Sequence, residues 1–323
     1  MASGNLPIPA GIRGTGTVKN AQRRRPKLFS RKSPGEIVFD ILNAFLLIMF
    51  CLTILYPFWN TLLISLASGS DVNSLGFRLW IKSWNINAYK FAFSKYGNVG
   101  IAYLNSILRT VVGTLAGVIV TLLAAYPLSK KDIPGRNFMT IYILVTMFFS
   151  GGLIPTYLLI RRIGLFNNRL VLILPALVQG YYVIIMRNFL MTIDPAFEES
   201  AFMDGANFFQ ILVRIVVPLS KPVIATIALW IAVWHWNQWF DALIYLSSER
   251  KIVLQLLLRR MIQQMTQLQN EQMQQYMELQ EVELPTQSVR AAITILTIGP
   301  IIFFYPFLQK YFVKGIFLGS LKG

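Results

Sequence analysis

Apolar residues in this 323-residue chain gather into long runs that hold almost no charged side chains, and polar segments separate the runs. A helix that crosses the hydrocarbon core of a membrane, about 30 Å thick, needs about 20 consecutive apolar residues. Six runs come close to that length or exceed it, and they lie within 41–69, 110–129, 138–160, 170–186, 222–240 and 291–309. The pattern therefore predicts an all-α polytopic membrane protein with six transmembrane helices.

Composition agrees with a membrane protein, because 55% of the residues are hydrophobic and only 14% are charged. Soluble proteins carry about 25% charged residues. The composition excludes a soluble enzyme, a disordered chain and a disulfide-stabilised scaffold. Cys51 is the single cysteine and His235 the single histidine, which removes intramolecular disulfides and the usual zinc sites. We therefore expect neither a catalytic residue nor a metal or other cofactor bound by this chain.

The distribution of lysines and arginines predicts the orientation in the membrane. Residues 1–35 are strongly basic but lack the apolar core and cleavage site of a signal peptide, so we expect them to stay in the cytoplasm. With six spans, the segments on that side carry more basic residues than the segments on the opposite side, as the positive-inside rule requires. The expected organisation is a basic cytoplasmic segment at 1–35, a transmembrane domain at 36–312 and a cytoplasmic tail at 313–323, with both termini inside.

Two of the expected outside segments are long. Residues 70–98 are rich in aromatic side chains and are typical of an ordered cap or an interfacial belt. The segment 247–289 is polar and glutamine-rich, and its spacing predicts an amphipathic helix. The apolar stripe of that helix holds Leu254, Leu258, Met261, Met265 and Leu268. Methionine-rich stripes adapt to partners, so we expect contact with an extracytoplasmic protein; the alternative is packing on neighbouring loops of the same chain.

The segment 194–219, between the fourth and fifth predicted spans, has the pattern of a short helix-turn-helix on the cytoplasmic side. Asp194 followed by Pro195 is typical of a helix N-terminus. Gly205 ends the first helix, because glycine tolerates the positive φ of such a turn. A second helix follows, and we expect it to end at Pro218. Its apolar side holds Phe208, Ile211, Leu212 and Ile215.

At this segment the chain resembles the permease subunits of binding-protein-dependent ABC importers. The cytoplasmic signature of that family is Glu-Ala-Ala, three residues, Gly, nine residues, Ile, two residues and Pro. Ser200 replaces the first alanine, and an Asp-Gly-Ala triplet matches the carbohydrate-uptake branch. The positions that carry the resemblance, and the ATPase-coupling role it implies, are Glu199, Ser200, Ala201, Asp204, Gly205, Ala206, Ile215 and Pro218.

Other parts of the chain share the resemblance. They are Asn105–Ser106, Asn168–Arg169, Trp236–Asn237 and the C-terminal residues 311–323. All look like the second permease of carbohydrate importers, and most like the branch that takes up oligosaccharides and uronate-containing oligosaccharides. The glutamine-rich part of the long outside loop departs from that branch.

The resemblance implies the type I ABC importer permease fold and ATP-driven import of sugars, with oligosaccharides, including uronate-containing ones, as the expected substrates. It implies that 194–219 docks on ATPase subunits. Those subunits would bind ATP and Mg²⁺, since this chain lacks the Gly-x-x-x-x-Gly-Lys-Ser/Thr phosphate loop. The implied assembly contains a second permease, two ATPase subunits and an extracytoplasmic solute-binding protein, in the bacterial cytoplasmic membrane and without nucleic acid.

Two further contacts are implied by relatives of the maltose type. In those relatives the C-terminal tail enters the ATPase interface, and the loop before the last span reaches the binding protein. The resemblance therefore assigns contact with the binding protein to part of 247–289. It assigns contact with the ATPase interface to Gly319, Ser320, Lys322 and Gly323. The chain would then be a transport subunit and not itself an enzyme.

Polar residues near the outer ends of the predicted spans are candidates for the substrate path. Arg109 lies at the outer edge of the second span, where two interpretations are open: snorkelling or pairing with another residue, which we favour, and contact with substrate. Asp241 follows the tryptophan- and amide-rich residues 234–239, whose indoles and amides suit sugar rings. The alternative there is an interfacial tryptophan belt with a capping aspartate. The path candidates are Asn105, Arg109, Trp236, Asn237 and Asp241.

Two other classes of protein remain as alternatives to a transporter. One is a polytopic intramembrane enzyme, and the other is a membrane scaffold without transport activity. Neither class would require the cytoplasmic motif between Glu199 and Pro218.

Overall fold

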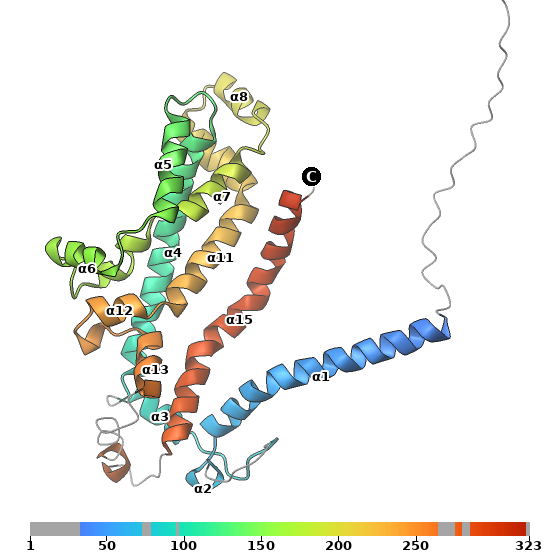
Figure 1. The fold of residues 1–323 in the computed structure, drawn as a ribbon, viewed down its shortest axis with the longest axis vertical. Coiled ribbons are helices and arrows are strands. Elements are labelled where there is room, and N and C mark those ends of the chain that lie inside the picture. Colours follow the sequence, from blue (N-terminus) through green and yellow to red (C-terminus); the bar gives the residue numbers. More distant parts are fainter. Residues whose placement is uncertain (1–32, 73–78, 95–96, 264–274, 280–284, 321–323) are drawn as a thin grey trace, which may run out of the picture. The chain divides into compact units, whose positions relative to one another are not determined.

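The computed structural model describes residues 33–72, 79–94, 97–263, 275–279 and 285–320. Within these residues the chain forms helices and an isolated β-bridge between Ala67 and Trp84. It separates into two compact units, Met1–Leu55 and Tyr56–Gly323. Figure 1 labels the helices in chain order.

The first helix, α1 (Pro34–Ser65), corresponds to the first predicted span. It begins with a capping box, in which the Ser33 backbone N–H donates to Glu36 Oε2 at 2.8 Å and the Glu36 N–H donates to Ser33 Oγ at 3.3 Å. Every side chain from 33 to 55 is exposed, although most of them are apolar. A helical segment of this length whose apolar side chains are exposed fits a lipid environment.

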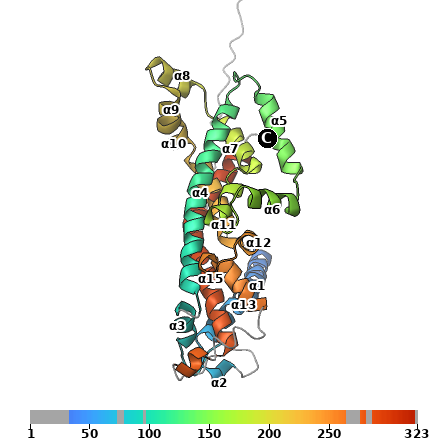
Figure 2. The same ribbon diagram turned by 90° about the vertical axis from the view of Figure 1, so that its left-hand side faces the viewer.

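The core of the second unit is built on α4 (Val99–Ser129), α7 (Gly180–Leu190) and α11 (Lys221–Asn237), which pack side by side (Figures 1 and 2). Small residues of α4 allow this approach. A Cβ at Gly113 would lie 2.3 Å from His235 Nε2, and a Cβ at Gly117 would lie 3.3 Å from Ile231 Cδ1. The cluster buried among these helices includes Ala125, Tyr126, Val183, Met186, Ile211, Ile227 and Ile231.

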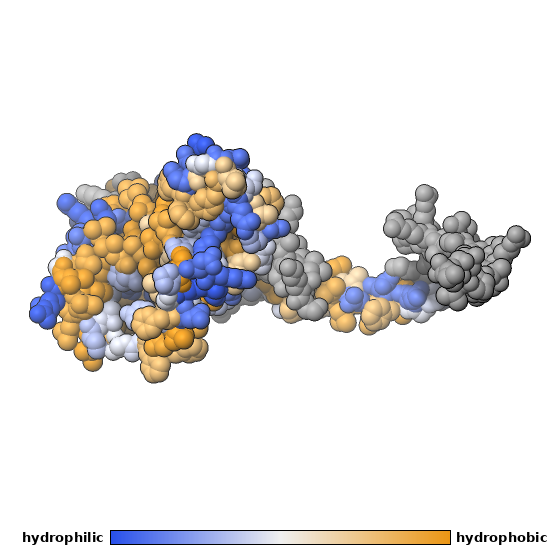
Figure 3. Space-filling view, turned by 90° about the horizontal axis from the view of Figure 1, so that it is seen from above, coloured by the Kyte–Doolittle hydropathy of each residue, from blue (hydrophilic) through white to orange (hydrophobic). Residues whose placement is uncertain are grey.

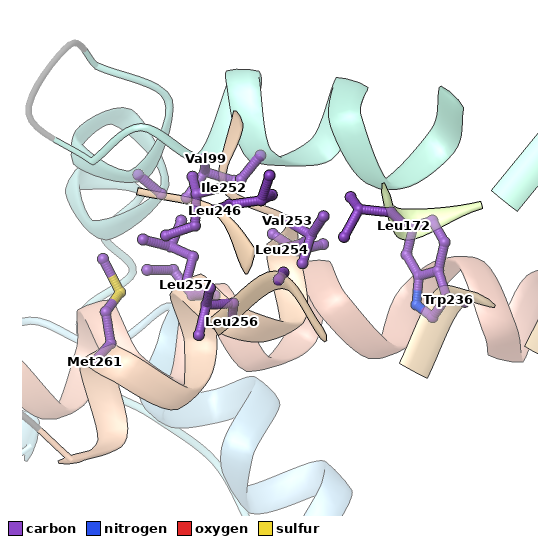
Figure 4. Close-up of a cluster of buried hydrophobic side chains, with 14 of the residues drawn as sticks. Val99, Leu172, Trp236, Leu246, Ile252, Val253, Leu254, Leu256, Leu257 and Met261 are labelled. Atoms are coloured by element: carbon purple, nitrogen blue, oxygen red, sulfur yellow. The ribbon is translucent and has the colours of Figure 1, made fainter. Parts of the chain in front are cut away.

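A second cluster lies at the opposite end of α4, where α3 (Asn87–Phe93), α12 (Phe240–Tyr245), α13 (Leu254–Gln263) and α15 (Thr286–Ser320) meet (Figure 4). Phe91 is buried there, so for this part of the aromatic segment 70–98 the structure favours an ordered cap over an interfacial belt. Trp80 and Trp84 of the same segment are exposed.

The amphipathic stripe of 247–289 was expected to contact a partner protein, but its described residues pack within the chain. Leu254 and Met261 are buried in this second cluster, and Leu258 packs against it. The expectation of a partner at Leu254, Leu258 and Met261 is therefore wrong, because the chain's own helices pack against these three residues. The other two stripe residues, Met265 and Leu268, lie outside the described residues.

Three helices, α1, α4 and α15, are each long and apolar enough to cross a membrane, and three more spans result if each bent helix pair counts as one. Counted in this way, the described residues contain the six predicted spans. The residues at which some of these spans begin or end differ from the prediction. The second span starts at Val99, not at Thr110. The helix of the sixth span, α15, continues to Ser320. It therefore includes residues 313–320, which we expected in the C-terminal tail.

The third predicted span, 138–160, is not a single helix. It consists of α5 (Arg136–Phe148) and α6 (Leu153–Arg162), whose axes meet at 111°. The break follows from Gly152, which has a φ of +82°. The fourth span likewise joins the 3₁₀ turns η1 (Arg169–Leu172) and η2 (Leu174–Ala176) to α7 with a bend of 48°.

Candidate functional site

The predicted helix-turn-helix at 194–219 is present. Its first helix is α8 (Ala196–Met203), and Asp194 Oδ1 accepts a hydrogen bond of 3.0 Å from the Ala196 backbone N–H, which supports the predicted N-terminus. The helix ends at Gly205, whose φ is +82°. The Ala206 N–H closes the turn by donating to the Ala201 carbonyl at 2.9 Å.

The second part starts with a capping box that the sequence analysis did not identify. The Gln210 N–H donates to Asn207 Oδ1 at 2.9 Å, and the Asn207 N–H donates to Gln210 Oε1 at 3.0 Å. The chain continues through α9 (Phe208–Ile211), the π-helical turn η3 (Leu212–Val216) and α10 (Val217–Leu219). An asparagine followed three residues later by a glutamine was the available signal.

The second helix ends one residue after Pro218, close to the expected position. The helix runs to Leu219, and an 82° bend then leads into α11. Proline lacks an N–H for the carbonyl four residues earlier, and the π-helical turn directly before it accommodates that missing bond. Pro218 thus lies in the last turn of this helix, directly before the bend.

Side chains of the segment divide into a buried and an exposed set. Ala201, Ile211 and Leu212 are buried in the cluster between α4, α7 and α11. The exposed fractions of Met203 and Phe208 reach 88% and 68%. Phe208 was expected on the same side as Ile211, but it instead makes an edge-to-face contact with Phe202, with ring centroids 4.9 Å apart.

The exposed set forms an apolar surface at the end of the unit that carries α8 (Figure 2). Its large apolar side chains are Phe197, Phe202, Met203, Phe208 and Phe209. Figure 3 views the molecule from this end, where apolar residues lie next to hydrophilic ones. Exposed apolar patches mark contacts with other proteins, with ligands or with a membrane.

The two neighbouring acids of α8 differ in their surroundings. Glu199, the acid of the motif, is exposed, whereas the Glu198 side chain is 13% exposed and forms an ion pair with Lys130. Within the described residues Glu199 is thus exposed to solvent, while Glu198 is engaged with Lys130.

The second polar group of interest surrounds Arg109. Its position is corrected, because it lies about three turns inside α4 and is only 3% exposed. Its guanidinium forms an ion pair with Asp241 and donates to the Gln238 carbonyl at 2.9 Å. Nε also donates to His235 Nδ1 at 3.4 Å, and the guanidinium carbon lies 5.7 Å from the Trp234 ring centroid. Of the alternatives for this residue, pairing is the one observed.

A cavity of 190 Å³ lies beside this pair, between α6, the 3₁₀ turns before α7, and the end of α11. Its polar lining residues are Thr156, Gln179, Gln238 and Asp241, and Trp234 contributes an indole. Amides, a carboxylate and an indole are groups that bind sugar hydroxyls and sugar rings. Gln179 and Thr156 were not among the sequence candidates, because nothing in their local pattern marks them.

The other path candidates have partners within the protein. Asn105 Nδ2 donates to the carbonyls of Arg250 and Ile252 at 3.0 and 2.9 Å. Buried Trp236 donates from Nε1 to the Thr297 carbonyl at 3.1 Å, and exposed Asn237 donates to the Val233 carbonyl at 2.9 Å. Asn105, Trp236 and Asn237 are not among the residues that line the cavity.

The predicted ATPase-interface tail lies only partly in the described chain. Gly319 and Ser320 belong to the last turn of α15. Lys322 and Gly323 lie outside the described residues.

Comparison with known proteins identifies the family. Residues 113–318 match the family described as "Binding-protein-dependent transport system inner membrane component". The chain belongs to this family. The permease therefore has the type I ABC importer fold that the motif at 199–218 implied, and it is a component of a binding-protein-dependent ABC transport system.

Similar proteins match nearly the whole permease. It is 36% identical over 289 residues to the polygalacturonan/rhamnogalacturonan transport system permease protein YtcP of Bacillus subtilis (strain 168), covering 88% of this chain and 99% of YtcP. It is 38% identical over 292 residues to protein LplC of the same organism, covering 88% and 95%. A chain in the crystal structure of a bacterial ABC transporter involved in the import of the acidic polysaccharide alginate aligns with a TM-score of 0.80 at 35% identity, covering 88% and 100%.

Proposed function

We propose that this permease forms half of the translocation pathway of an ATP-driven importer for uronate-containing oligosaccharides. The observation that carries the proposal is the similarity over 88% of the chain to a permease for polygalacturonan/rhamnogalacturonan and to a component of an alginate importer. Both named substrate classes contain acidic sugars. The alternatives of an intramembrane enzyme and a scaffold are not favoured by these relatives.

The proposed partners follow from the surfaces of the permease. A second permease completes the pathway, and the exposed apolar side chains of α8 and α9, with Glu199 beside them, dock on one of two ATPase subunits. ATP and Mg²⁺ bind to the ATPases. The tail that includes Gly319 and Ser320 contacts the ATPase interface, and an extracytoplasmic solute-binding protein delivers the sugar. Both termini lie in the cytoplasm.

The cavity beside Arg109 and Asp241 is the part of the pathway that this chain supplies. Trp234 offers an aromatic face, and the Gln179 and Gln238 side chains offer donors and acceptors for hydroxyl groups. Asn105, Trp236 and Asn237 support the walls of the path through their internal hydrogen bonds.

The test is ATP hydrolysis by the complete complex in proteoliposomes. The permease is purified with its second permease and ATPase, and the cognate binding protein is added with oligogalacturonate or with a neutral oligosaccharide of equal length. We expect the acidic oligosaccharide to stimulate hydrolysis several-fold and the neutral one to have little effect. Omission of the binding protein is the control. Equal stimulation by both sugars contradicts the uronate assignment, and purification of the permease without an ATPase contradicts the importer.

A further inference from the structure

One carboxylate oxygen links α8 to the end of α4. Lys130, which follows the last residue of α4, forms an ion pair with Oε2 of Glu198. The Tyr126 hydroxyl donates to the same oxygen at 3.3 Å. Lys130 Nζ also lies 4.7 Å from the centroid of the Tyr126 ring. The contact therefore joins an ion pair, a hydrogen bond and a cation–π interaction.

The contact is shielded from solvent more than an ordinary surface ion pair. The side chains of Glu198 and Lys130 are 13% and 30% exposed, and Tyr126 is buried. Exposed pairs are weakened by salt and by side-chain freedom, whereas a partly buried pair with a further hydrogen bond holds its geometry. Successive residues of a helix point about 100° apart. This rotation leaves Glu199 exposed while Glu198 faces the chain's own helices.

The end of α4 that receives this contact is itself anchored. The Leu128 carbonyl accepts a hydrogen bond of 3.0 Å from Arg136 Nε and another of 3.0 Å from Arg187 Nε. Carbonyls in the last turn of a helix have no partner within the helix, and cations there also favour the helix dipole. The two arginines come from the start of α5 and the last turn of α7, so both helices hold the same point of α4.

The opposite half of α4 contacts the chain beyond α11. Asn105 binds the carbonyls of Arg250 and Ile252, and Ser106 Oγ accepts a hydrogen bond of 2.9 Å from the Leu254 N–H. Arg109 pairs with Asp241. A single continuous helix thus contacts α8 at one end and the segment 241–254 at the other.

We propose that Glu198 is a positioning residue for coupling, which fixes α8 to α4 through Lys130 and Tyr126. A displacement of α8 by the ATPase is then transmitted along α4 to the Arg109–Asp241 pair and the segment 241–254. This inference rests on the proposed function, since it assumes that α8 docks on an ATPase. It assigns different roles to two neighbouring acids: Glu199 faces the partner, and Glu198 holds α8 on its own permease.

The experiment measures uptake and ATP hydrolysis together in proteoliposomes that contain the complete complex. The variants are Glu198→Gln, Lys130→Gln, Tyr126→Phe and the exchange Glu198→Lys with Lys130→Glu. Lys131→Gln is the matched control, because it removes the same charge from the exposed neighbouring lysine. The probe is the oligogalacturonate that stimulates the wild-type complex.

We expect Glu198→Gln and Lys130→Gln to transport about tenfold less sugar per ATP hydrolysed, equivalent to about 1.4 kcal/mol of coupling, while the subunit composition of the complex is unchanged. Tyr126→Phe should show a smaller fall. The exchange variant should recover most of the ratio, and Lys131→Gln should match the wild type. A purely structural contact would reduce the yield of complex but not the ratio of sugar to ATP.

Two results overturn the inference, and they are distinguishable. If the wild-type complex responds to oligogalacturonate and the Glu198 and Lys130 variants keep its ratio of sugar to ATP, the positioning role is wrong and the proposed function stands. If the wild-type complex hydrolyses ATP without a response to any oligosaccharide, the proposed function fails and the positioning role fails with it.

Discussion

The charge of Arg109 is neutralised inside the protein. Its guanidinium is divided between Asp241, the Gln238 carbonyl and His235, so it has no free donor pair directed at a substrate carboxylate. An unpaired charge at membrane depth is expensive, and such groups are found in pairs or beside water. The pair joins α4 to α12, while Gln179, Gln238 and Trp234 line the cavity beside it.

Breaking this pair on one side should destabilise the permease more than removing both charges. We expect Arg109→Met and Asp241→Leu each to lower stability by roughly 3 kcal/mol, because each leaves a buried charge without a partner. The double variant should melt closer to the wild type than either single variant does. The measurement is the melting temperature in detergent for all four proteins. Additive losses in the double variant would show that the two side chains are not coupled.

At the scale of helices, positive φ at a glycine controls where the segment 194–219 turns. Gly205 has a φ of +82°, and its N–H donates to the Phe202 carbonyl at 3.0 Å. Gly164, at the end of α6, is similar: its φ is +74°, and its N–H donates to the Arg161 carbonyl at 3.2 Å. A Cβ at either glycine would meet no atom within 4 Å. The two glycines therefore have similar local conformations. They differ in position, because Gly205 lies between α8 and α9 and Gly164 follows α6.

Proline at these two sites should separate folding from coupling. Gly205→Pro and Gly164→Pro both remove the N–H and force a φ near −65°, so both should lower stability to a similar degree. Only Gly205→Pro should abolish association with the ATPase and sugar uptake, since it distorts the turn between α8 and α9. Pull-down of the ATPase by each membrane-inserted variant checks this. Normal association of Gly205→Pro would contradict the docking role of the segment.

Local signals in the sequence predicted local structure well. The start of a helix at Asp194–Pro195 and the turn at Gly205 both depend on nearby residues. The structure confirms both predictions. Long-range partners left no such signal. The pairing of Arg109 with Asp241 joins residues 132 positions apart, and the pairing of Lys130 with Glu198 joins residues 68 positions apart.

At the scale of the whole molecule, a large apolar surface sets the environment. The side chains of α1 from 34 to 55 are all exposed and mostly apolar, and much of the surface of the second unit is apolar as well (Figure 3). Soluble monomers rarely expose such continuous apolar area. The family places the permease in the inner membrane, where lipid covers this surface.

The proposed topology, with both termini in the cytoplasm, can be tested with single cysteines. Cys51 is the only native cysteine, so Cys51→Ser provides a background without thiols. Asp132→Cys lies in the segment between α4 and α5, and Ser247→Cys lies between α12 and η4 (Glu249–Lys251); both positions are exposed. Asp132 follows the C-terminal end of α4. Ser247 follows α12, whose Asp241 pairs with Arg109 in the N-terminal half of α4. The positive-inside distribution predicts that Asp132 lies in the cytoplasm and Ser247 outside.

A maleimide that does not cross the membrane should therefore label Ser247→Cys in intact spheroplasts and label Asp132→Cys only after permeabilisation. Sugar uptake by both variants serves as the control for native insertion. The reverse labelling would place the coupling segment 194–219 on the outside, away from any cytoplasmic ATPase. Because the Lys130 contact with Glu198 holds α8 next to the segment that contains Asp132, that result would also remove the basis for coupling through α8.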